Sequence, residues 1–339
     1  HLDGLRLDAI DHVRDPAAPD ILTEIAQQVR ARFPHAHLTT EDSRNITHLH
    51  ERDSEGRPTL YTGEWNDDFH NVAHVIATGE SEGYYADFVD DPWPRFGRAL
   101  AEGFIWQGEY SPHAEAPRGA PSAHLPPTAF VDFLQNHDQT GNRAFGERLV
   151  TLTSVPMIRA LMTIHLLSPH IPLLFMGEEW GETRPFAFFT DFEGDLARAV
   201  RDGRRREFAA FAAFEDAALR DRIPDPNAVG TFEASRIDWG RVTSADGRGW
   251  LGFTRGLLAL RHARIVPHLK GAGGDGGRVL LARDGLIAVD WHLNGAVLGL
   301  RANLSEAAAI LPDAAGVCLL GTPGPLAAHE VAVWLEEVA

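Results

Sequence analysis

The sequence contains a single cysteine, Cys318. One cysteine cannot form an internal disulfide, and it rules out a zinc site built from several thiolates. No run of about 18 apolar residues, the length that crosses a membrane as a helix, occurs in the chain. A basic segment followed by an apolar one, as in a secretory signal, is also absent from the N-terminal residues. These absences favour a cytoplasmic location.

Basic residues are few compared with acidic ones. The 339 residues include 31 Lys and Arg against 48 Asp and Glu, a formal net charge of −17. Such a chain is repelled by phosphate groups, which argues against a nucleic-acid partner. A neutral polar substrate such as a sugar meets no such repulsion. Hydrophobic residues make up 44% of the chain, and its length suits one large domain and a smaller one.

The first residues lack a Met and begin almost inside a strand. Residues 5–8 alternate apolar and charged side chains, which is the period of a strand. Asp20 then precedes a helical pattern and is a plausible N-cap, and a second strand is predicted over 36–41. Strand, helix and strand in this order are typical of a parallel sheet. We expect that a further N-terminal segment precedes this chain in the functional protein.

The alternation continues along the chain. Further strands are predicted over 60–66, 130–136 and 171–176, and helices over about 67–79, 153–168 and 250–263. Residues 80–128 form a long segment rich in glycine, proline and aromatics, and connections of that length are usually functional. Residues 185–240 read as irregular, with the basic run Arg204–Arg206 on a solvated helix face. Four short β-like runs then predict a small all-β domain, at 278–283, 286–293, 296–303 and 328–335.

Three predicted strands end at an acid: Asp8, Glu41 and Asp138. In a β/α barrel the chemistry lies at the carboxyl ends of the strands, so the three side chains would converge. Paired carboxylates are what cleavage of a glycosidic bond requires. Arg6 shares the face of Asp8 and would favour its ionised form. A lone Arg-x-Asp is more often a structural ion pair, and it is the joint occurrence of the three strand ends that favours catalysis.

The motifs around these acids resemble the α-amylase family of glycoside hydrolases. The segment Gly4-Leu5-Arg6-Leu7-Asp8-Ala9 is similar to the nucleophile strand of that family, Glu41 to its acid/base position, and Asn136-His137-Asp138 to its transition-state-stabilising motif. The resemblance implies a retaining mechanism in which Asp8 is the nucleophile, Glu41 the acid/base and Asp138 the stabilising residue. For its role, Glu41 would have to stay protonated near neutral pH.

Within that family, four longer motifs are similar to those of malto-oligosyltrehalose trehalohydrolases, which release trehalose from malto-oligosyltrehalose. They begin at Thr40, Trp65, Gln135 and Gly177. The resemblance implies a cytoplasmic enzyme that acts on this α-glucan without a cofactor or metal. Residues predicted to bind substrate are Arg6, Asp67, Asp68, His137, Trp65, Gln139 and Arg143.

The same resemblance implies a (β/α)8 barrel in which the Asp8 strand is the fourth. Residues 1–265 would then hold about strands four to eight, and 266–339 a C-terminal β-sandwich domain. The missing N-terminal barrel segment would be needed in cis or as another chain, so we expect the 339 residues alone to be inactive and poorly stable.

Three alternatives stay open at this point. The chain could belong to a branching enzyme or another transglycosylase, in which a sugar hydroxyl replaces water. It could also be a noncatalytic carbohydrate-binding fragment. A metal site at Asp11, His12, His137 and Asp138 is a weaker interpretation, because these histidines lack the helical spacing of a zinc motif.

Overall fold

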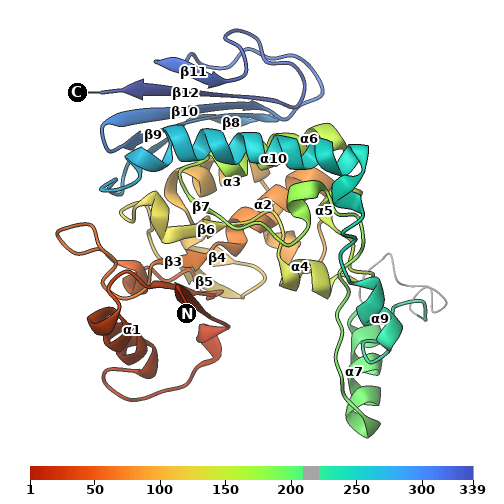
Figure 1. Cartoon of the computed structure of the whole chain (residues 1–339). Coiled ribbons are helices and arrows are strands. Elements are labelled where there is room, and N and C mark those ends of the chain that lie inside the picture. The colour runs from red at the N-terminus through yellow and green to blue at the C-terminus, as the bar shows by residue number, and fades with distance from the viewer. Residues whose placement is uncertain (209–220, 339) are drawn as a thin grey trace. The chain divides into compact units, whose positions relative to one another are not determined.

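The computed structural model describes residues 1–208 and 221–338. The chain forms two compact units, each assembled from separate stretches of sequence (Figure 1). The first comprises His1–Leu134, Arg159–Leu173 and Leu257–Ala339. The second comprises Gln135–Ile158 and Leu174–Gly256. Neither unit therefore corresponds to a single continuous stretch of the sequence.

A five-stranded parallel sheet forms the centre of the first unit. Its order follows the chain, and every neighbouring pair is parallel: β1 Gly4–Leu7, β2 His37–Thr40, β3 Gly63–Trp65, β6 Phe130–Asp132 and β7 Ile171–Pro172. All five predicted strands are confirmed; β1 has the predicted length but begins one residue earlier, and the other four are shorter than predicted. Parallel order brings the carboxyl ends of the strands to one edge of the sheet, where Asp8 and Glu41 follow β1 and β2.

Helices follow the strands as the sequence predicts. They are α1 Ile21–Arg32, α2 Asp67–Thr78, α6 Val155–Leu167 and α10 Ala245–Arg264. The Asp20 N-cap is confirmed, because its carboxylate accepts from the amides of Leu22 and Thr23, each at 3.0 Å. An acid at this position also interacts favourably with the N-terminal end of the helix dipole.

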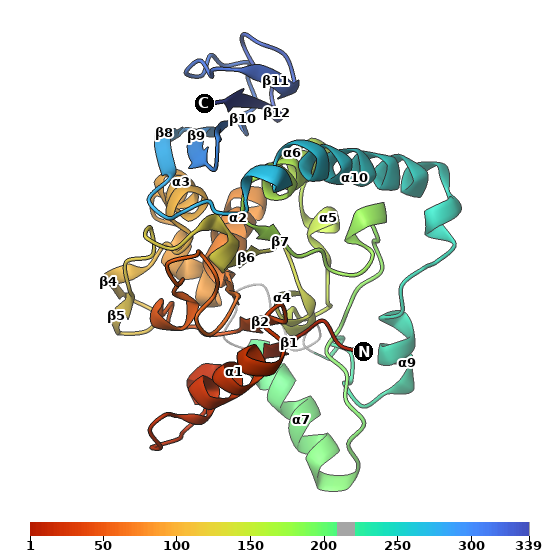
Figure 2. The same cartoon turned by 60° about the vertical axis from the view of Figure 1, so that its left-hand side comes forward.

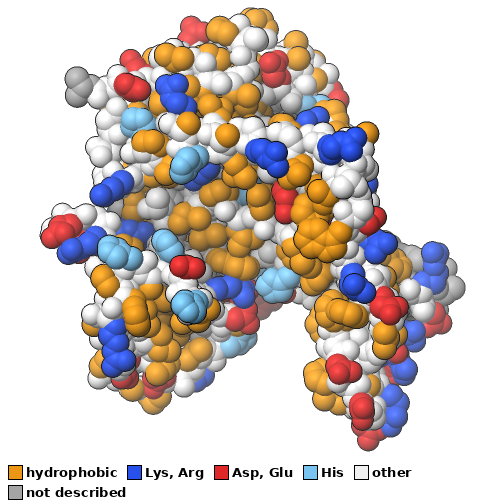
Figure 3. Space-filling model, viewed as in Figure 1, with side chains coloured by type: hydrophobic (Ala, Val, Ile, Leu, Met, Phe, Trp, Pro, Cys, Tyr) orange, Lys and Arg blue, Asp and Glu red, His pale blue; other side chains and the backbone are white. Residues whose placement is uncertain are grey.

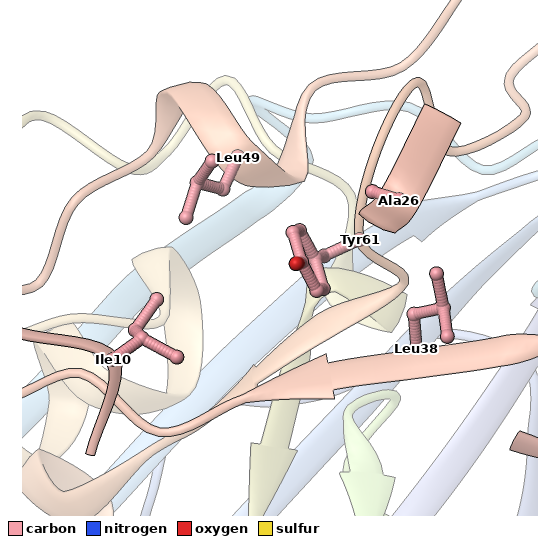
Figure 4. Close-up of a cluster of buried hydrophobic side chains, with 5 residues drawn as sticks. All are labelled: Ile10, Ala26, Leu38, Leu49 and Tyr61. Carbon is pink, nitrogen blue, oxygen red and sulfur yellow. The ribbon is translucent and has the colours of Figure 1, made fainter. Parts of the chain in front are cut away.

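Packing between α1 and the first strands of the sheet forms one hydrophobic core of the first unit. Figure 4 shows its five fully buried members, which come from different elements: Ile10, Ala26, Leu38, Leu49 and Tyr61. The Tyr61 hydroxyl also donates to the Leu22 carbonyl, at 2.8 Å. These contacts fix α1 against the sheet next to β1 and β2, the strands that Asp8 and Glu41 follow.

The long segment 80–128 is more regular than predicted. It contains helix α3 Pro92–Glu102 and the antiparallel pair β4 Gln107–Ser111 and β5 Ala116–Gly119. Helices α2 and α3 lie side by side (Figure 2). Helix α3 was missed because its first residues, Pro-Trp-Pro, and the glycine at position 97 are typical of turns.

The C-terminal residues form one antiparallel sheet in the order β11-β12-β10-β9-β8. Its strands are β8 Gly277–Arg283, β9 Leu286–Leu293, β10 Ala296–Asn303, β11 Val317–Leu320 and β12 Glu330–Glu337. The four predicted strands are present, and β11 was missed because its four residues, Val-Cys-Leu-Leu, show no alternation of apolar and polar side chains. Among residues 266–338 a single sheet is described, whereas the predicted sandwich has two.

This C-terminal sheet is held to helix α3. A Cβ on Gly97 would lie 2.8 Å from the Ala282 Cβ, so the helix approaches β8 as closely as glycine allows. The Trp291 indole N–H donates to the Leu100 carbonyl at 2.8 Å. Consistent with these contacts, Leu257–Ala339 belongs to the same compact unit as the parallel sheet. The predicted boundary at residue 265 does not coincide with the division between the units.

The second unit is mainly helical. It contains α4 His137–Asn142, α5 Leu149–Leu152, α7 Gly194–Glu207 and α9 Val229–Ala234, with the beginnings of α6 and α10. The prediction of an irregular segment over 185–240 is therefore wrong for α7 and α9, while 209–220 lie outside the described residues. Figure 3 shows side chains of both charges along α7.

The prediction of a solvated basic run is also wrong for Arg204. This side chain is buried, and its Nη2 donates to the carbonyls of Gly141 at 3.2 Å and Arg143 at 3.1 Å. Burial lowers the pKa of Arg204. A run of three arginines has the same composition whether one of them turns inward or not, so composition could not distinguish the two cases.

Candidate active site

Two of the predicted catalytic acids lie next to each other on neighbouring strands. Leu7 on β1 is paired with Thr40 on β2, so Asp8 and Glu41 each follow directly at the carboxyl end. The Glu41 amide donates to the Leu7 carbonyl and the Ile10 amide donates to the Glu41 carbonyl, both at 3.0 Å. These bonds extend the strand pairing through Glu41 and fix its backbone.

Arg6 joins the two carboxylates. Its Nη1 lies 2.7 Å from Asp8 Oδ1, and its Nη2 lies 2.6 Å from Glu41 Oε2. The Ala9 amide also donates to Glu41 Oε2, at 3.1 Å. On its other side the guanidinium lies over the Trp65 ring, 3.8 Å from the ring centroid. Stacking and two ion pairs together hold the guanidinium plane in one orientation.

The turn after Asp8 is in an unusual conformation. Ala9 has a φ of 45°, in the left-handed region that residues with a Cβ rarely adopt. This conformation directs the Ala9 amide at Glu41 rather than along the strand. Strained backbone of this kind is often found at functional sites.

The two acids differ in environment and in their affinity for protons. The Asp8 side chain is 71% exposed, and that of Glu41 is 21% exposed. Burial, followed by a hydrogen bond with Asp8, raises the pKa of Glu41 to about 7, against the opposing effects of the Ala9 amide and Arg6. The pair therefore offers an exposed carboxylate and a neighbouring carboxyl that keeps its proton close to neutral pH.

Asp138, the third predicted acid, lies in the second unit, at the beginning of α4. The Asn136 side chain caps this helix by accepting from the Asp138 amide at 2.8 Å. Asn142 donates to Asp138 Oδ1, also at 2.8 Å. Within this unit Gln139 is buried, His137 is exposed, and Arg143 pairs with Glu147 at 3.2 Å. Asp138, His137, Gln139 and Arg143 thus share one short helix and the residue that follows it.

The two acids at the start of α2 have different surroundings. Asp67 is partly exposed, whereas Asp68 is fully buried. Asp68 Oδ2 accepts from the Ile105 amide at 2.8 Å and from Asn45 Nδ2 at 2.7 Å, and Oδ1 pairs with Arg118 at 3.1 Å. These partners favour a structural role for Asp68, which anchors the loop after Glu41, over the predicted contact with substrate.

Three aromatic side chains that could otherwise stack on the flat face of a sugar are buried. Tyr85, Trp106 and Trp180 each expose less than a tenth of their surface, while Trp65 is partly exposed beside Arg6. Trp65 is therefore the aromatic residue that the structure brings together with both Asp8 and Glu41 through a shared partner.

Sequence reasoning missed a buried polar cluster behind Glu41. It consists of Thr40, His50 and Glu64, none of which has any exposed surface. The sequence signal for this cluster was Glu64 itself, which is a charged residue in the middle of the central strand β3. An acid at such a position needs polar partners, because an unpaired buried charge is costly.

The described residues contain no group of three or more His, Cys, Asp or Glu side chains placed to hold a metal ion. No helix within 1–208 or 221–338 combines the length and the apolarity needed to cross a membrane.

Comparisons with known proteins agree with these motifs. Residues 274–334 match a family described as "Domain of unknown function (DUF3459)". The chain is 37% identical over 275 residues to the malto-oligosyltrehalose trehalohydrolase of Deinococcus radiodurans, covering 79% of this chain and 43% of that protein. It is 34% identical over 331 residues to the enzyme of the same name from Brevibacterium helvolum, covering 95% of this chain and 54% of that one.

Solved structures give the same picture. A protein of Salmonella typhimurium, described as a candidate alpha amylase, has 52% identity and a TM-score of 0.95, covering 99% of this chain and 57% of its own. A cyclic maltosyl-maltose hydrolase from Arthrobacter globiformis shares the fold, with 14% identity and a TM-score of 0.58. The chain thus spans about half the length of the relatives it matches.

Proposed function

The chain belongs to the α-amylase family of glycoside hydrolases, and we propose that it contributes the three catalytic acids of a malto-oligosyltrehalose trehalohydrolase. The reaction would be hydrolysis of the α-1,4 bond next to the terminal trehalose unit, with release of trehalose. The observation that carries the proposal is the arrangement of Asp8 and Glu41 around Arg6, at the carboxyl ends of adjacent parallel strands.

In the first step Asp8 would attack the anomeric carbon. Arg6 at 2.7 Å favours the ionised carboxylate, and the exposure of Asp8 leaves it accessible to a sugar. Glu41 would donate its proton to the departing glycosidic oxygen as the bond from Asp8 forms. A carboxyl whose pKa is about 7 still holds a proton at neutral pH, which is the state that this step requires.

In the second step the roles reverse. Glu41, now ionised, would take a proton from water, which attacks the glycosyl-enzyme and frees Asp8. Loss of the negative charge on Asp8 in this intermediate removes an interaction that raises the pKa of Glu41. The pKa of Glu41 therefore falls, and its carboxylate stays ionised at the step in which it must act as the base. Two displacements at one carbon restore the original α configuration.

Asp138 would bind sugar hydroxyls and stabilise the distorted ring, assisted by the exposed His137. Trp65, Asp67, Gln139 and Arg143 are proposed as further substrate contacts, with Arg6 as the link between the acids. The proposal for Asp138 is supported by its matching motif, Asn136-His137-Asp138, and by the cap and the Asn142 contact that hold it in one orientation.

We also propose that the five parallel strands are strands four to eight of a (β/α)8 barrel. Support comes from their uninterrupted parallel order and from the greater length of the related proteins. Activity would then require the complementary barrel segment, in cis or from another chain.

The alternative within the family is a branching enzyme, in which a sugar hydroxyl attacks the intermediate. A noncatalytic carbohydrate-binding role is the alternative from another class. The enzyme that contains this chain, incubated with malto-oligosyltrehalose, should release trehalose and a shortened malto-oligosaccharide. New α-1,6 branches would instead indicate a transglycosylase, and binding without turnover a noncatalytic role. Asp8→Asn, treated in the same way, controls for contaminating glycosidases.

A further inference from the structure

The cluster of Thr40, His50 and Glu64 lies directly behind the end of strand β2. The Thr40 hydroxyl donates to Glu64 Oε2 at 2.6 Å, and His50 Nε2 lies 2.9 Å from the same oxygen. Thr40 and Glu64 are paired across β2 and β3, so their side chains leave the sheet on the same face. All three side chains are completely buried.

The surroundings of this cluster favour uncharged groups. Burial raises the pKa of Glu64, and the Asp42 carboxylate adds to this, while Thr40, the Asp42 amide and Arg44 oppose it. Burial and then Arg52 lower the pKa of His50 to about 3, against the effects of Asp42 and Glu51. A protonated Glu64 beside a neutral His50 places no charge in the interior, which is the inexpensive arrangement.

The residues that interact with Glu64 flank Glu41 in the sequence. Thr40 precedes Glu41 and Asp42 follows it, and successive side chains of a strand point to opposite faces. Glu64 therefore engages the strand end from behind, while Glu41 points forward to Arg6. The Asp42 carboxylate is itself held by Arg44 at 2.6 Å, so both neighbours of Glu41 are fixed.

We infer that Glu64 is a positioning residue for Glu41: by bridging Thr40 and His50 behind the sheet, it fixes the strand end that holds the Glu41 carboxyl against Arg6 and out of water. The inference rests on the proposed role of Glu41 for its effect on turnover, but its structural part concerns only where the carboxyl lies. Loosening the strand end admits water to Glu41 and removes part of the burial that keeps it protonated.

Two variants remove the bridge from different sides. Thr40→Val deletes the hydroxyl with little change in shape, and Glu64→Leu deletes the acid. Glu64→Gln is the rescue variant, since its amide can still accept from Thr40 and pair with His50. Tyr61→Phe is the matched control: it removes a buried hydroxyl from the same packed layer, bonded to Leu22 at 2.8 Å, without touching Thr40 or Glu64.

The direct measurement is the titration of the Glu41 carboxyl by ¹³C NMR, with its resonance assigned by its loss in Glu41→Gln. Thr40→Val and Glu64→Leu should lower the pKa of Glu41 by about half a unit or more, whereas Glu64→Gln and Tyr61→Phe should leave it in place. An unchanged titration in a folded Thr40→Val protein overturns the inference, even if Glu64→Leu fails to fold.

The kinetic measurement uses the enzyme that contains this chain. Thr40→Val should lower kcat about tenfold with little change in KM, because small displacements of a catalytic group are costly, and should move the alkaline limb of the pH profile to lower pH. Full activity of Glu41→Gln would disprove the proposed function, while the titration would still decide whether Glu64 positions Glu41. A normal pH profile in Thr40→Val would overturn the inference alone.

Discussion

Replacement of Glu41 by glutamine should make the stability of the protein less sensitive to pH. In the folded protein the Glu41 carboxyl holds its proton up to about pH 7, whereas its ordinary pKa is 4.5. Protonation therefore favours the folded state. This contribution is fully present below pH 4.5 and is lost as the pH rises through about 7.

The size of the effect follows from the two pKa values. Each pKa unit corresponds to about 1.4 kcal/mol, so the difference between 4.5 and about 7 gives a total change of about 3 kcal/mol. Most of this change, about 2 to 3 kcal/mol, falls between pH 5 and pH 8. It is large compared with the stability of an ordinary domain, which is roughly 5–15 kcal/mol.

The assay is urea unfolding at pH 5, 6, 7 and 8, followed by tryptophan fluorescence, since the chain has eight tryptophans. The free energy of unfolding of the wild type should fall relative to that of Glu41→Gln as the pH rises. Any constant cost of losing the Arg6 contact cancels, because only the change with pH is compared. A parallel pH dependence in the two proteins would refute the reasoning.

Asp8→Asn supplies an internal control for this experiment. It removes both the hydrogen bond and the charge by which Asp8 raises the pKa of Glu41, while the burial of Glu41 remains. The pH-dependent loss of stability should therefore become smaller in an Asp8→Asn background without disappearing.

Four further outcomes are expected. In the enzyme that contains this chain, Asp8→Asn should lower kcat by several orders of magnitude without unfolding the protein; more than a few per cent residual activity would remove the nucleophile assignment. Glu41→Gln should impair cleavage of the natural substrate far more than that of an activated glycosyl fluoride, which needs little protonation, and equal losses would point to a structural Glu41. NMR of the first reducing sugar formed should show the α anomer before mutarotation, since β product would mean a single displacement. Asp20→Ala should cost about 1 kcal/mol of unfolding free energy through loss of the α1 cap, as measured by denaturation.

Much of the parallel sheet could be predicted because each of its strands ends at a clear sequence signal. The runs before Asp8 and Glu41 are short and apolar or β-branched, and Asp20 marks the start of the helix between them. Local pattern and final structure agree there, because the same side chains that favour a strand also fill the core against α1.

The remainder depended on contacts that a local pattern does not contain. Helix α3 carries two prolines in its first turn and a glycine in its interior, and Gly97 lies where β8 packs against the helix. Arg204 turns inward to carbonyls about 60 residues earlier in the chain, which no property of the basic run could indicate. Glu64 was overlooked because its partners, Thr40 and His50, are 24 and 14 residues away.

For the candidate site, sequence located the acids but not their surroundings. Arg6 was expected beside Asp8, and the structure adds its contact with Glu41 and its stacking on Trp65. Asp67 and Asp68 looked equivalent in the sequence, although one is partly exposed and the other completely buried. Neighbouring helical residues point in directions about 100° apart, so two adjacent acids can have one side chain buried and the other exposed.

The assembly of the first unit from three separate stretches has a consequence for synthesis on the ribosome. Helix α3 emerges soon after its neighbour α2, but its partners in β8 and β9 follow nearly 200 residues later. Contacts of such long sequence separation form slowly, and the chain must keep apolar surface of α3 open until then. Slowing translation before residue 277 should therefore prolong the period in which the nascent protein needs a chaperone, whereas slowing it after residue 303 should matter less.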